Sequence, residues 1–184
     1  MINLRYLISA VIPVVAFTLP SYAASIEGTT SEKRDSLHEI ADYRQLGEMR
    51  FKKFIFHIYD AELRVAGSDF SWDQPFALTL TYARKIARED LVDASLSEIA
   101  RIEDTQIDTV EYLRAPLAAC FSDVRDGDQI TGHSLDVNKA VFYFNGQQTC
   151  VLDAPGASKS FFSIWLGDNT MDPERSRELL GMAD

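Results

Sequence analysis

The chain lacks the motifs that most often assign a chemistry. Its 184 residues contain no glycine-rich phosphate loop, no G-x-S-x-G sequence and no H-E-x-x-H sequence. Its two cysteines, Cys120 and Cys150, and its three scattered histidines do not have the spacing of zinc ligands. We therefore expect no cofactor and no structural metal.

The chain also lacks an apolar run long enough to cross a membrane as a helix. Its most apolar segment, residues 7–19, is short and contains Pro13. Ser21-Tyr22-Ala23 then places small residues at the −3 and −1 positions of a signal-peptide cleavage site. We expect residues 1–23 to be a signal peptide, with cleavage after Ala23 and export to the periplasm; an uncleaved N-terminal anchor is the alternative. Residues 24–184 then form one domain.

Basic residues are few. The chain has 18 Lys and Arg against 28 Asp and Glu, and its net charge at pH 7 is −10. A surface this acidic argues against binding nucleic acid and against docking on an anionic membrane. After removal of the signal peptide, we expect no stable membrane insertion. The charge identifies no protein partner.

The two cysteines leave two interpretations open. Export to an oxidising compartment permits a disulfide. Cys120, at the end of a predicted helix, could meet Cys150, early in a predicted strand. Buried free thiols, which pack as small hydrophobic groups, are equally compatible with the sequence.

The order of the predicted elements is that of an α+β fold. Alternation of apolar and polar residues predicts a strand at 76–82 with Phe76 and Tyr82 facing inward. Asn145-Gly146 between two apolar runs predicts a hairpin with a type I′ turn. Strands, then helices, then a hairpin and further helices favour an antiparallel sheet with helices on one face. The predicted elements are strands at 51–65, 76–82, 129–135, 141–144 and 147–152, and helices at 88–101, at 105–121 with a bend or break at Pro116, at 161–166 up to Gly167, and from Asp172-Pro173 onward.

The run of residues 51–65 is predicted as one central strand, covered on both sides, because both of its faces are largely apolar. Phe54 and Phe56 share one face, and Arg50 joins the strand with the same parity. A guanidinium at the mouth of an apolar strand face can hold a carboxylate through paired N–H donors. An exposed arginine at the end of a strand is the alternative interpretation.

Five blocks of the sequence, taken in order, are similar to the chalcone isomerase-like proteins, in particular to their small exported bacterial branch. The resemblance implies an open-faced β-sandwich, in which a layer of helices covers one face of a large antiparallel sheet and a ligand cleft lies between the two. The blocks are Leu46–Leu63, Phe76–Ile86, Phe121–Asp128, Phe142–Gly146 and Phe161–Gly167.

The resemblance also implies a set of ligand-binding residues. Plant enzymes of this family cyclise chalcones to flavanones, and other members bind fatty acids without catalysis through an arginine and a tyrosine. The family arginine falls on Arg50, and Tyr59 is one candidate for the assisting tyrosine. The candidate ligand-binding residues are Arg50, Phe54, Phe56, Tyr82, Ile164 and Trp165.

Apolar residues, Phe54 and Ile164, occupy positions where the plant enzymes carry polar catalytic groups, and the ring closure needs such groups. We therefore assign no catalytic residue and expect a protein that binds a small amphipathic carboxylate, such as a fatty acid. The alternative is an isomerase, an intramolecular lyase acting on a small conjugated substrate with Arg50 as the electrophile. In a third interpretation the cleft is filled and its aromatic residues only pack against each other.

Overall fold

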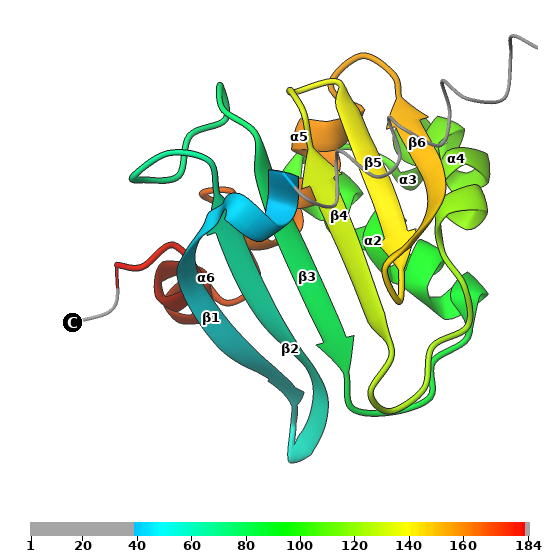
Figure 1. Ribbon diagram of the computed structural model, residues 1–184. Helices are drawn as coiled ribbons and strands as arrows, with labels where there is room; N and C mark the ends of the chain where they lie inside the picture. The colour runs from blue at the N-terminus through cyan, green and yellow to red at the C-terminus, as the bar shows by residue number, and fades with distance from the viewer. Residues whose placement is uncertain (1–38, 183–184) are drawn as a thin grey trace, which may run out of the picture.

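The computed structural model describes residues 39–182, so the predicted signal peptide and its cleavage site lie outside the described range. Six strands form one antiparallel sheet in which each strand pairs with the next along the chain (Figure 1). This arrangement confirms the predicted antiparallel sheet. The strands are β1 (Arg44–Lys53), β2 (Phe56–Val65), β3 (Phe76–Tyr82), β4 (Gln129–Ser134), β5 (Lys139–Phe144) and β6 (Gln147–Asp153).

Helices cover one face of this sheet (Figure 1). The predicted helix at 105–121 is split, because a 3₁₀ turn η1 (Glu111–Leu113) separates two short α-helices. Pro116 lies in the first turn of the second short helix, Arg114–Cys120. Backbone N–H groups in a first turn make no hydrogen bond within the helix, so the missing N–H of proline costs nothing there. The helices are α2 (Arg88–Ile102), α3 (Ile107–Val110), α4 (Arg114–Cys120), α5 (Ala157–Leu166) and α6 (Pro173–Leu179). No helix within residues 39–182 has the length and apolarity to cross a membrane.

The core lies between the sheet and these helices. As predicted, Phe76 and Tyr82 of β3 are buried on the inner face. Phe162 of α5 is fully buried and meets the Phe76 ring edge-on at 5.0 Å. A side chain at Gly132 would overlap the Phe162 ring, so β4 lets α5 approach the sheet closely at this point. Each such buried aromatic contributes about 1.5–3 kcal/mol through removal of its surface from water.

A helical turn at residues 39–42 covers part of the opposite face of the sheet (Figure 1). Ile40 and Tyr43 pack there against Ala77 and Val141. The Tyr43 hydroxyl lies 3.1 Å from Nε2 of the fully buried His133 of β4. Most of the rest of this face carries polar side chains from β1 to β4, and we call it the open face.

The prediction of one central strand over residues 51–65 is wrong. The chain reverses at Phe54 and Ile55, and β1 and β2 form a hairpin in which Lys53 pairs with Phe56. β1 is an edge strand of the sheet rather than a central one. Phe54 and Ile55 made both faces of residues 51–65 look apolar in the sequence, but in the structure both residues are exposed at the turn.

The other predicted hairpin is confirmed, because β5 and β6 are joined by Asn145 and Gly146. Both residues have positive φ angles, 49° and 77°, as a type I′ turn requires. A disulfide joins Cys120, at the end of α4, to Cys150 of β6, with 4.8 Å between their Cα atoms. The bridge ties the helical layer to the edge of the sheet opposite β1.

Candidate functional site

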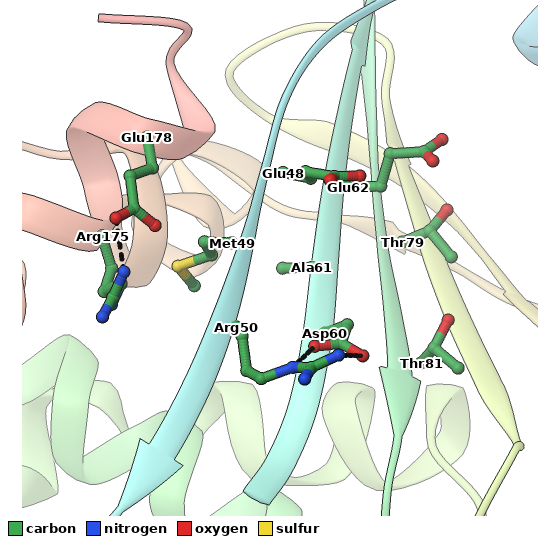
Figure 2. A pocket seen from close by; sticks show the side chains of 10 residues that line it. All are labelled: Glu48, Met49, Arg50, Asp60, Ala61, Glu62, Thr79, Thr81, Arg175 and Glu178. Atoms are coloured by element: carbon green, nitrogen blue, oxygen red, sulfur yellow. Dashed lines mark hydrogen bonds and ion pairs between the residues drawn. The ribbon is translucent and has the colours of Figure 1, made fainter. Parts of the chain in front are cut away.

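Arg50 lies on the open face of the sheet, not at the mouth of a cleft under the helices. It pairs with Asp60 across β1 and β2; its Nε donates to Oδ1 at 2.7 Å and its Nη2 to Oδ2 at 3.2 Å (Figure 2). The Arg50 side chain is 59% exposed, and the ion pair holds the pKa of the Asp60 carboxyl below its ordinary value. The predicted placement of Arg50 beside Phe54 and Phe56 on an inward face is therefore wrong.

A hollow of about 500 Å³ lies along β1, β2 and β3 beside Arg50 (Figure 2). Its lining combines four carboxylates with two guanidiniums, and both guanidiniums are already engaged: Arg50 by Asp60, and Arg175 by Glu178. An anionic head group placed here would meet excess negative charge, so this hollow does not suit a carboxylate ligand. The lining residues are Glu48, Met49, Arg50, Asp60, Ala61, Glu62, Thr79, Thr81, Arg175 and Glu178.

Three polar aromatic side chains meet on the inner face of the same strands. Tyr59 of β2 and Tyr82 of β3 are register partners whose ring centroids lie 6.0 Å apart. Trp165 of α5 donates its indole N–H to the Tyr59 hydroxyl oxygen at 2.9 Å. The Tyr59 oxygen acts as the acceptor, so its own proton stays available to a further acceptor. The Tyr82 hydroxyl forms no hydrogen bond with residues 39–182.

Burial keeps these two phenols protonated. Removal from water raises the pKa of Tyr59 to about 12, and it raises the pKa of Tyr82 further. Both groups are therefore neutral hydrogen-bond donors at any physiological pH. Two O–H donors in one apolar region are an arrangement that a carboxylate can use, because each of its oxygens accepts hydrogen bonds.

The remaining predicted site residues divide between the inside and the outside of the molecule. Ile164 of α5 is partly buried and packs against the core near Trp165. Phe54 and Phe56 lie at the β1–β2 turn, where their side chains are 88% and 56% exposed. The structure thus brings Tyr82, Ile164 and Trp165 into the layer between sheet and helices and leaves the two phenylalanines outside it.

Two neighbours of the candidate site were missed from the sequence. Phe51 stacks on the Tyr59 ring with 5.0 Å between centroids, and Asp60 neutralises Arg50. Both contacts depend on the β1–β2 hairpin, which folds residues 44–53 against residues 56–65. The turn at Phe54 and Ile55 contains no Gly, Asn or Pro, so no local signal marked it.

The model of the chalcone isomerase-like family matches residues 48–181. This chain belongs to the chalcone isomerase-like family. Its fold is also similar to that of a fatty-acid binding protein from Arabidopsis thaliana, with a TM-score of 0.59 and 10% sequence identity over 76% of this chain and 87% of that chain. At such low identity the similarity shows the fold alone, and it confirms the open antiparallel sheet with its helical layer. Among proteins with curated annotation, none matches the sequence.

The described part of this chalcone isomerase-like protein also contains no cluster of three or more His, Cys, Asp or Glu side chains that could hold a metal ion. Hydrogen-bond donors and apolar surface meet on the inner face of the sheet. The phenols of Tyr59 and Tyr82, with the indole of Trp165, are the groups that combine both.

Proposed function

We propose that this chalcone isomerase-like protein binds a small amphipathic carboxylate, such as a fatty acid, between its sheet and its helices, and that it does so without catalysis. The observation that carries the proposal is a pair of neutral phenols, the buried Tyr82 and the partly buried Tyr59, beside the indole of Trp165. The fatty-acid binding by the Arabidopsis thaliana protein of the same fold supports it.

In this proposal the carboxylate accepts hydrogen bonds from the Tyr59 and Tyr82 hydroxyls. The apolar body of the ligand lies against Ile164 and Trp165, after their side chains have moved apart to admit it. Phe51, stacked on Tyr59, borders the same region. A hydrogen bond to a charged group contributes about 1.5–3 kcal/mol, so each phenol has a measurable share of the affinity.

Arg50 has no part in this contact set, because it lies on the other face of the sheet and is paired with Asp60. The same placement removes the geometric basis for an isomerase that uses Arg50 as its electrophile. A filled cleft, in which the aromatic residues only pack, predicts no ligand at all, and the binding experiment below distinguishes it from the proposal.

The experiment is a titration with a long-chain fatty acid and with its methyl ester, followed by calorimetry and by the intrinsic fluorescence to which Trp72 and Trp165 both contribute. We expect the acid to bind more tightly than the ester, because the ester cannot present a charged acceptor. Tyr82→Phe should weaken the binding of the acid at least tenfold, and Arg50→Ala should leave it unchanged. Equal binding of acid and ester, or no binding of either, would refute the proposal.

We also propose that the protein is exported to the periplasm after cleavage of residues 1–23. The Cys120–Cys150 disulfide supports this location, because disulfides persist in oxidising compartments. Mass spectrometry of the protein recovered from the periplasmic fraction should find an N-terminus at Ala24. A protein recovered only from the cytoplasm with Met1 intact would contradict the proposal.

A further inference from the structure

The β1–β2 turn exposes three consecutive large apolar side chains at the end of a projecting hairpin (Figure 1). Phe54, Ile55 and Phe56 are 88%, 86% and 56% exposed. Single exposed apolar residues are common on protein surfaces, but a contiguous group at a protruding tip indicates an interaction site. We call residues 52–56 the hairpin tip.

The backbone of the hairpin tip is strained in a way that the other hairpin of the sheet avoids. Phe54 has a φ angle of 57°, although a bulky side chain in this left-handed region costs about 1–2 kcal/mol. A positive φ at the first of two turn residues is the pattern of a type II′ turn, in which glycine is preferred at that position. The β5–β6 turn uses Asn145 and Gly146 for its positive φ angles. Stability alone would favour a similar turn at residue 54. Strained residues are common at functional positions, which makes Phe54 a candidate for an interaction.

Basic side chains surround the apolar residues of the tip. Lys52 and Lys53 immediately precede Phe54 and are exposed. Within residues 39–182 neither lysine takes part in an ion pair. The guanidinium carbon of Arg84, in the loop after β3, lies 5.6 Å from the centroid of the Phe56 ring. The tip therefore combines exposed apolar side chains with neighbouring cationic side chains, although the net charge of the chain is −10.

We propose that the hairpin tip docks this protein on a lipid surface that contains anionic headgroups. Phe54, Ile55 and Phe56 enter the boundary between headgroups and acyl chains, and Lys52, Lys53 and Arg84 contact the headgroup phosphates. Lysine and arginine side chains suit this position, since their aliphatic stems lie along apolar surface while their charges remain in water. A second acidic copy of this chain offers no matching anionic apolar surface at its own tip, so a lipid surface fits the tip better.

The net charge of the chain argues against docking on an anionic membrane, but the projecting tip changes that conclusion. Electrostatic interactions fall off over about 8 Å at physiological ionic strength. A membrane that touches the tip therefore responds mainly to the local cations and only weakly to the acidic body of the protein. The proposal does not depend on the fatty-acid site, because docking requires only residues 52–56 and Arg84.

The test is co-sedimentation of the protein, expressed at full length and purified as the cell processes it, with lipid vesicles. One set of vesicles contains phosphatidylcholine alone, and the other contains phosphatidylcholine mixed with phosphatidylglycerol. We expect binding to the mixed vesicles, weakened by salt. The variant Phe54→Gly/Ile55→Ser should bind at least tenfold more weakly, and its glycine keeps the turn favourable, so the fold is retained. Lys52→Gln and Lys53→Gln should each weaken binding about fivefold.

Matched controls separate the tip from general surface properties. Met171 is 63% exposed and lies between α5 and α6, so Met171→Ser should leave vesicle binding unchanged. With mixed vesicles, Phe54→Trp should show a blue shift and a quenching by brominated acyl chains that the native protein, with Trp72 and Trp165 alone, does not show. This difference reports entry of the tip below the headgroups. Equal vesicle binding by the native protein and the Phe54→Gly/Ile55→Ser variant would overturn the proposal. The proposal would also be overturned if neither protein binds vesicles and the native protein forms a dimer in solution that the variant does not form.

Discussion

Replacing both members of the Cys120–Cys150 disulfide with alanine should destabilise the protein substantially. The cysteines are 30 positions apart, and the bridge closes a loop that contains β4 and β5 with their connections. For a loop of this length, the chain-entropy relation gives about 12 cal/mol/K, which is about 3.6 kcal/mol at 25 °C. Most stable domains of this size have only about 5–15 kcal/mol in total, so the double variant should lose a large share of its stability.

Urea unfolding followed by circular dichroism measures this loss. With a slope of about 2 kcal/mol per molar urea, the midpoint should fall by roughly 2 M. The slope itself should rise, because an unfolded chain without the cross-link is more expanded. Reduction of the native protein should reproduce both changes, which separates the loss of the cross-link from the loss of sulfur packing at Cys120. A loss below about 1 kcal/mol with an unchanged slope would refute the entropic reasoning.

Three further predictions concern other parts of the fold. Burial lowers the pKa of His133 from its ordinary 6.5, so below pH 6.5 the unfolded chain takes up a proton that the folded one does not. The unfolding free energy should therefore fall as the pH drops below 6.5. Urea titrations at several pH values check this, and the dependence of the unfolding free energy on pH should be weaker in His133→Gln. Gly47→Ala should cost about 1–3 kcal/mol and raise hydrogen exchange in α6, because its Cβ would overlap backbone carbonyl oxygens of that helix; unchanged exchange would contradict this. Phe54→Gly should raise the unfolding free energy by about 1 kcal/mol in the same urea assay.

Elements with strong local signals were predictable from the sequence. The alternation in residues 76–82 places β3 and its inner face, because a strand with period two and one apolar face has only one way to pack. The Asn145-Gly146 pair identifies the β5–β6 turn, since both residues adopt positive φ at low cost. Asp172 accepts a hydrogen bond from the backbone N–H of Arg175 and begins α6, as a side-chain cap with a following proline predicts.

The face on which Arg50 lies was not predictable in this way, because it depends on pairing between strands rather than on any local pattern. A strand's parity relates its own residues to each other, but it does not say which face the helices cover. The turn at Phe54 carries no turn signal, and a register irregularity between Phe51 and Lys52 breaks the alternation in β1. Only the pairing of Arg50 with Asp60 assigns the guanidinium to the open face. Because this turn consists of apolar residues, the sequence did not indicate the hairpin. The same residues leave Phe54 exposed at the tip, where the lipid-docking proposal uses it.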